Sequence, residues 1–114
     1  MAKDFTGQWL RVRNTIKKDF GIKPELDGIL FIIGMQELGR IEESFSKDEK
    51  QDLMHVAVCS ILAPFGFYQI VGHDEDNWPV WEQIKPLPKF EKPIDQEQFL
   101  KEHIIHYFEA HEYI

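Results

Sequence analysis

The stretch that decides the fold is residues 66–84, GFYQIVGHDEDNWPVWEQI, because it is the one place where the helical pattern of the chain stops. Two runs rich in aromatic and β-branched residues, 68–71 and 80–84, flank the acidic polar turn 73–77. Runs of this kind around a polar turn are typical of a β-hairpin. A short helix capped by Asn77 is the alternative for part of this stretch. The pattern as a whole favours the hairpin.

A first helix is predicted over residues 5–20. Its apolar residues recur at spacings of three or four, so they form one stripe along the helix; these residues are Phe5, Trp9, Val12, Ile16 and Phe20. Asp4 is the expected N-cap, and Gly21 is expected to end the helix in a left-handed conformation.

A second helix is predicted over residues 25–38. Pro24 precedes it and Gly39 follows it, which is the usual asymmetry of helix ends. Its centre is apolar on every side, as in a buried element. Gly28 and Gly34 lower helix propensity, and we expect a neighbouring helix to approach them closely in compensation.

A third helix is predicted to begin at Ser46, because Ser46 and Glu49 have the spacing of a capping box. It should end before Pro64 and be the most buried element, since apolar residues surround its axis.

A fourth helix is predicted after a proline-rich connector. Asp95 is the expected N-cap, and Gln98 completes a second capping box. Ile94 and Phe99 occupy the positions of a hydrophobic staple. We expect this helix to run to the C-terminus.

Composition supports one domain of mainly α class. The chain has 114 residues, of which 43% are hydrophobic, enough for a core without disulfides. The predicted fold is α with a minor β part: four helices, with one hairpin at about 66–84 inserted between the third and fourth. Residues 1–114 are expected to form this single helical domain.

The compartment expected from the sequence is the cytoplasm. Cys59 is the only cysteine, so no internal disulfide can form, and a lone thiol fits a reducing environment. The N-terminal residues lack the apolar run of a signal peptide, and no apolar segment approaches the length that spans a bilayer.

The charge of the chain is acidic overall but uneven. The net charge is −7, which argues against nucleic acid as a partner. Residues 1–23 hold six Lys or Arg and two Asp, a balance of +4, so the remainder carries −11. The basic first helix is predicted to face the acidic remainder, within the chain or across a dimer. Docking on an anionic partner is the alternative.

The hairpin tip and the residues just after it are the candidate site for a ligand or partner: His73, Asp74, Asp76, Trp78 and Trp81. Exposed tryptophans would indicate a partner, whereas buried ones would belong to the core. The core position is favoured. The acidic turn lacks the glycine and the distal glutamate of a calcium-binding EF-hand loop.

The fourth helix carries a weaker candidate for a metal site. Glu102, His106 and Glu109 fall on one face of a helix, and carboxylate with imidazole can hold a divalent metal such as Zn. The motifs of zinc proteases and di-iron proteins are absent. No cofactor is therefore expected, and a divalent metal is the alternative.

Two further histidines are assigned structural roles. His111 lies within the apolar arc of the fourth helix and is expected to be buried or half-buried. His55 and Cys59 share a face of the third helix, but burial should raise the pKa of the thiol and make it inert. The chain also lacks a phosphate-binding loop and a serine-nucleophile motif.

The function predicted from these features is a small cytoplasmic interaction or assembly module without catalysis, acidic and capable of homodimerisation. Its expected partner is a protein, including a second copy of itself. The alternative is a metal- or small-ligand-binding protein, including an enzyme, built on the His/Glu face of the last helix and the hairpin tip.

Overall fold

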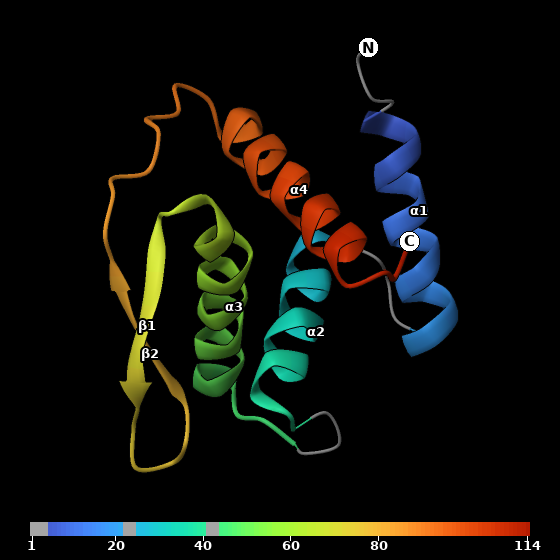
Figure 1. Ribbon diagram of the computed structural model, residues 1–114. Helices are drawn as coiled ribbons and strands as arrows, with labels where there is room; N and C mark the ends of the chain where they lie inside the picture. The colour runs from blue at the N-terminus through green and yellow to red at the C-terminus, as the bar shows by residue number, and fades with distance from the viewer. Residues whose placement is uncertain (1–4, 22–24, 41–43) are drawn as a thin grey trace. The chain divides into compact units, whose positions relative to one another are not determined.

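The computed structural model describes residues 5–21, 25–40 and 44–114. These residues form, in order, α1 (Phe5–Phe20), α2 (Leu26–Leu38), α3 (Lys47–Leu62), the 3-10 turn η1 (Ala63–Phe65), β1 (Tyr68–His73), β2 (Pro79–Gln83) and α4 (Pro93–Ala110) (Figure 1). Of the described residues, 63% are helical and 11% are in strands. The predicted class is confirmed: the fold is mainly α, with four α-helices among the described residues and one antiparallel hairpin between α3 and α4.

The chain groups into two compact units, Met1–Ile29 with Phe90–Ile114, and Leu30–Lys89. The first unit contains α1 and α4. The second contains most of α2, all of α3 and the hairpin. The prediction of one domain over residues 1–114 stays a prediction.

In the first unit, α1 packs against α4. The predicted stripe of α1 is turned inward at its centre, where Val12 and Ile16 are buried. The helix ends as expected, because Gly21 is left-handed with φ of 65° and its N–H donates to the carbonyl oxygen of Lys17 at 3.1 Å. The expected N-cap, Asp4, lies outside the described residues.

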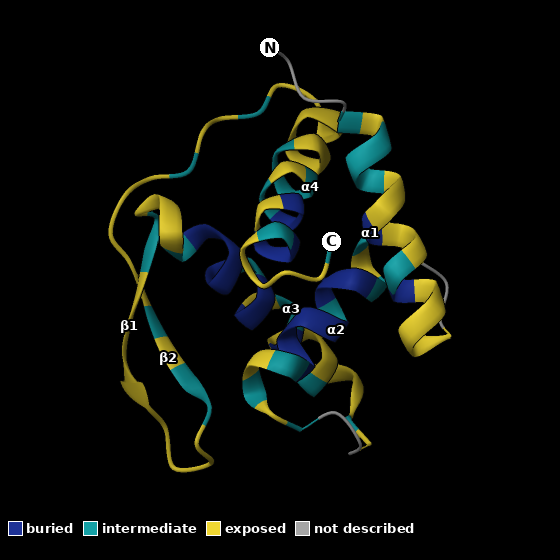
Figure 2. Ribbon diagram, turned by 45° about the vertical axis from the view of Figure 1, so that its right-hand side comes forward, coloured by how far each residue is buried: buried dark blue, intermediate teal, exposed yellow. Residues whose placement is uncertain are grey.

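In the second unit, α2 and α3 approach each other closely at Gly34. A Cβ atom on Gly34 would overlap the backbone of Leu53, lying 2.7 Å from its carbonyl carbon. The predicted compensation for a glycine within the helix is therefore confirmed at Gly34. Figure 2 shows the result, with buried residues concentrated on α2 and α3 and both strands intermediate or exposed.

The N-terminus of α3 is fixed by the predicted capping box. Ser46 is the N-cap and its Oγ accepts from the Glu49 N–H at 3.1 Å, while the Ser46 N–H donates to Glu49 Oε1 at 2.9 Å. The hydrogen bond that the Ser46 N–H donates to the Glu49 carboxylate is the largest cause that lowers the pKa of this carboxyl, and the Ser46 side chain adds to it. At its other end α3 passes into η1, which Gly66 terminates in a left-handed conformation.

The hairpin forms as predicted, and it contains one bulge. Ile70 pairs with Trp81 and Gly72 pairs with Val80, so Val71 is an extra residue in β1. The alternative prediction, a short helix capped by Asn77, is wrong, because Asn77 lies in the turn between the strands with φ of 66°.

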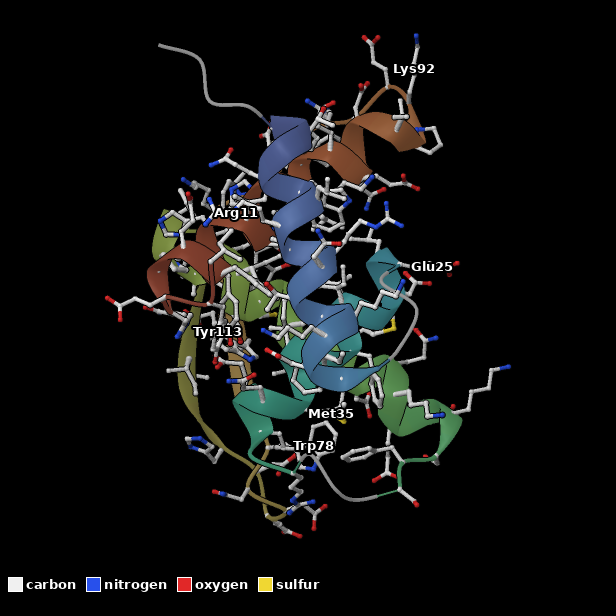
Figure 3. All side chains as sticks on the ribbon, turned by 90° about the vertical axis from the view of Figure 1, so that its right-hand side faces the viewer. Arg11, Glu25, Met35, Trp78, Lys92 and Tyr113 are labelled. Atoms are coloured by element: carbon white, nitrogen blue, oxygen red, sulfur yellow. The ribbon has the colours of Figure 1, made fainter. Side chains whose placement is uncertain are left out.

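The two ends of α4 differ from the prediction. Asp95 is not the N-cap: Lys92 (labelled in Figure 3) occupies that position and Pro93 begins the helix. Proline suits a first helical position because its φ is preset and no N–H is lost there. The staple prediction is also wrong, because Ile94 is 65% exposed.

The C-terminal end of α4 is a left-handed cap rather than a continuation to the terminus. The helix stops at Ala110, and Glu112 has φ of 60°. The Glu112 N–H donates to the Glu109 carbonyl oxygen, and the Tyr113 N–H donates to the Phe108 carbonyl oxygen at 2.8 Å. This is the pattern of a Schellman motif.

Among the described residues, none of the helices has the length and apolar character needed to cross a membrane.

Candidate functional site

The hairpin presents one face of β1 and β2 to a pocket, and the bulge decides which residues share that face. Side chains alternate along a strand, so residues three apart in β1 would normally point to opposite sides. The extra residue Val71 shifts the alternation by one position, so Ile70 and His73 point to the same side. Ile70 with Trp81, and His73 with Pro79, therefore form two cross-strand pairs on one face.

This pocket, here called the hairpin pocket, lies within the second unit and has a volume of about 200 Å³. The hairpin face contributes half of its lining residues, and β1 packs beside α3 (Figure 1). The lining residues are Glu37, Leu38, Ser60, Ile70, His73, Asn77, Pro79 and Trp81. Two predicted site residues, His73 and Trp81, are thus brought together.

Two polar atoms of the residues that line this pocket have no hydrogen-bond partner among the described residues. They are Ser60 Oγ and Trp81 Nε1, and both are buried. Ser60 as a whole is only 8% exposed. A buried donor without a partner costs about 1–3 kcal/mol, so native proteins usually satisfy such groups with protein, water or a ligand.

The tryptophans are neither core residues nor fully exposed. Trp78 and Trp81 are both half-buried. Trp81 has its indole nitrogen covered and lines the pocket, whereas Trp78 follows the hairpin tip and is not among the lining residues.

Asp74 organises the tip of the hairpin. Its Oδ1 accepts hydrogen bonds from the N–H groups of Asp76 and Trp78, both at 2.9 Å, and its own N–H donates to the carbonyl oxygen of Trp78 at 2.9 Å. Arg40 Nη2 donates to the carbonyl oxygen of Asp76 at 3.1 Å. The exposed carboxylate of Asp74 is therefore engaged in holding the turn.

A second pocket lies in the first unit, between α1 and α4, with a volume of about 300 Å³. It is lined by all three residues of the weak metal candidate together with three others: Phe5, Gln8, Glu102, Ile105, His106 and Glu109. Gln8 Nε2 donates to Glu109 Oε2 at 3.1 Å. Within the described ranges, no three His, Cys, Asp or Glu side chains gather closely enough to hold a metal ion.

His111 does not take the buried position that the sequence pattern suggests. It is exposed, because α4 ends at Ala110 and His111 is the C-cap. Its ring lies 4.2 Å from the Tyr107 ring and 5.8 Å from the Tyr113 ring, centroid to centroid. The early end of the helix thus removes His111 from the apolar arc.

Cys59 is buried and His55 is exposed, although Cys59 Sγ lies 3.6 Å from His55 Nε2. Burial raises the pKa of the Cys59 thiol to about 11. A thiol with this pKa is almost wholly protonated near neutral pH, so the pair does not supply a thiolate nucleophile.

The basic residues of α1 lie on the surface. Arg11, Arg13, Lys17 and Lys18 are all exposed. An anionic partner could contact these side chains only if they are exposed. Charged residues are usually exposed in any protein, however, so their exposure does not indicate a partner. Their partner stays a prediction.

Sequence reasoning missed the other six lining residues of the hairpin pocket, three from α2 and α3 and three from the hairpin: Glu37, Leu38, Ser60, Ile70, Asn77 and Pro79. Nothing local distinguishes Ser60, which is one small polar residue in an apolar helix. One signal did point to the bulge: Gly72 interrupts the β1 pattern, and an isolated glycine in a strand often marks a bulge.

Comparison of this chain with protein-family models, with curated proteins and with solved structures found no match.

Proposed function

We propose that this chain is a small non-catalytic interaction module that associates with a second copy of itself through its hairpin. The observation that carries the proposal is a group of three exposed aliphatic residues, Val71, Val80 and Ile84, here called the hairpin patch. They are 54%, 42% and 49% exposed. An antiparallel sheet normally turns a polar face to solvent, so aliphatic residues there favour a covering partner.

The hairpin patch is separate from the hairpin pocket. Val80 and Ile84 alternate with the pocket residues Pro79 and Trp81, so they face the other way. Glu82 lies between them in sequence, and its Oε1 accepts from Gln69 Nε2 at 2.8 Å. The only carboxylate of β2 is therefore already hydrogen-bonded within the hairpin.

Charge limits where a second copy can bind. Each copy carries a net charge of −7, so two copies repel unless they meet through a surface of low charge. β1, with the sequence YQIVGH, contains no Asp, Glu, Lys or Arg. β1 therefore offers an uncharged strand along which two acidic copies can meet.

We further propose a reducing, cytoplasmic location. The single cysteine, Cys59, is a buried free thiol, which suits a compartment where disulfides are rare.

Sedimentation velocity over the micromolar range tests the association. We expect a concentration-dependent dimer that Val71→Lys and Val80→Lys each weaken or abolish, because a buried unpaired ammonium is unfavourable. Leu10→Lys is the matched control, since Leu10 is an exposed aliphatic residue of α1. A monomer at every concentration, or a dimer indifferent to both hairpin variants, would contradict the proposal.

Binding of a metal or small ligand by Glu102, His106 and Glu109 is the second candidate. One observation favours it, because these residues line one pocket. It ranks second because they form no metal-binding group and Glu109 already accepts from Gln8. Metal analysis of untagged protein tests this second candidate. If the protein contains no bound zinc, and added zinc does not raise its melting temperature, the metal site is rejected.

A further inference from the structure

The outward face of α1 carries positive charge and no negative charge. Its four basic residues are Arg11, Arg13, Lys17 and Lys18, and all are exposed. Among the described residues, no hydrogen bond or ion pair engages any of the four. Asp19 is the only acidic residue of α1, and at 100° per residue it lies about half a turn around the helix from Leu10. The four charges are therefore available to an anionic partner.

Two apolar side chains share this face with the cations. Leu10 is 51% exposed and Phe20 is 36% exposed. Residues seven apart in a helix differ by only about 20° around the axis, so Leu10 lies in line with Lys17, and Phe20 lies in line with Arg13. The outward face of α1 therefore presents apolar and basic side chains together.

The acidic helix of the same unit lies on the other side of α1. The buried residues Val12 and Ile16 mark the inward side of α1, which packs against α4, and Figure 3 shows α4 behind α1. α4 carries exposed carboxylates at Asp95, Glu97 and Glu102. Packed helices have axes about 8–10 Å apart, which is close to the Debye length at physiological salt. A flat anionic surface against α1 therefore meets the cations directly, and salt screens much of the repulsion from α4.

The apolar residues on this face restrict the kind of anionic partner. A phosphate backbone would pair with the cations but would leave Leu10 and Phe20 unused, and the net charge of −7 disfavours nucleic acid. A lipid surface takes both kinds of side chain, because anionic headgroups attract Lys and Arg while apolar side chains reach the acyl boundary. We propose that the outward face of α1 docks on an anionic lipid surface. The cytoplasmic leaflet is the negatively charged one, which agrees with the proposed location.

Co-sedimentation of the full chain with lipid vesicles tests this proposal. We expect binding to vesicles of phosphatidylcholine mixed with phosphatidylserine, and no binding to vesicles of phosphatidylcholine alone. Raising the salt until the Debye length falls to about 3 Å should release the protein.

Charge reversal on the outward face should weaken the binding to phosphatidylserine vesicles. Each Lys or Arg near an anionic membrane strengthens binding about fivefold, so Arg13→Glu with Lys17→Glu should weaken it at least about 25-fold. The matched control is Lys47→Glu with Lys89→Glu, which changes the net charge equally at exposed lysines of the second unit. Far-UV circular dichroism checks the fold of each variant, and Arg11→Glu with Lys18→Glu replaces the first pair if that pair does not fold.

The apolar contribution has its own variant. Leu10→Ser leaves every charge in place, and it should weaken binding by about three- to tenfold because apolar area is lost from the lipid interface.

Each other outcome overturns the proposal. Absence of binding to phosphatidylserine vesicles means that the face is an ordinary solvated surface, and binding to a DNA duplex instead would assign it to nucleic acid. Equal binding to phosphatidylcholine alone means that charge does not select the surface. An equal loss of binding in the control pair means that net charge, and not α1, governs the contact.

Discussion

Ser60 carries a hydroxyl that the folded chain buries without a partner among the described residues. Because the unsatisfied group destabilises the native state, we expect Ser60→Ala to raise the free energy of unfolding by about 1 kcal/mol. Urea denaturation measures this, with Ser44→Ala as the surface control. A loss of stability of similar size would show instead that a bound water satisfies the hydroxyl.

Cys59 makes stability depend on alkaline pH. Burial raises the pKa of its thiol from 9.0 to about 11, so folding favours the protonated form. This contribution is complete below pH 9 and is lost as the pH rises towards 11, because the unfolded thiol ionises first.

The free energy of unfolding of the wild type should therefore fall relative to that of Cys59→Ala between about pH 9 and about pH 11, the pKa values of the unfolded and folded thiol. The variant is the control for other alkaline groups, including Tyr68, whose pKa is raised chiefly by burial. A difference between the two proteins that does not change over this range would refute the assignment.

Individual residues of the site were only partly predictable from the sequence. His73 and Trp81 were identifiable because they flank a polar turn between two strands. Ser60 was not, because its importance lies in a missing partner that only the packed structure reveals. His111 was placed wrongly, since periodicity assumes a helix that continues, and α4 ends one residue earlier.

At the scale of elements, the contact between α2 and α3 depends on Gly34. We expect Gly34→Ala to lower the free energy of unfolding by about 2 kcal/mol or more, because the new Cβ overlaps the Leu53 backbone and overpacking outweighs the gain in helix propensity. Chemical denaturation measures the loss.

Gly39→Ala is the matched control for this change. Gly39 is left-handed with φ of 79°, and a Cβ there would meet nothing within 4 Å. Gly39→Ala should lower the free energy of unfolding by about 1 kcal/mol only, because a left-handed conformation strains an alanine. If the two substitutions were equally costly, close helix packing would not explain Gly34.

Elements with two agreeing signals were predicted well, and elements with competing signals were not. α3 has a capping box and a uniform apolar pattern, and it begins at the expected residue. The start of α4 has a capping-box spacing at Asp95 in competition with Pro93, and the proline decides. The end of α4 depends on a left-handed conformation at Glu112. The sequence does not indicate this, because non-glycine residues such as glutamate seldom adopt a positive φ.

At the scale of the whole molecule, the net charge of −7 and the hairpin patch work in opposite directions. Charge repulsion keeps copies apart, and the aliphatic side chains Val71, Val80 and Ile84 favour contact. Their balance depends on ionic strength, because salt screens the repulsion. Added salt should therefore strengthen the proposed dimer, and sedimentation at two salt concentrations measures the effect.

The most direct test of the hairpin as the interface is amide hydrogen exchange of residues 68–84 at low and high protein concentration, with Val71→Lys beside the wild type. We expect slower exchange in these residues at high concentration for the wild type and no such change for the variant. Exchange that is the same at both concentrations in the wild type would contradict the proposal that this hairpin joins two copies of the chain.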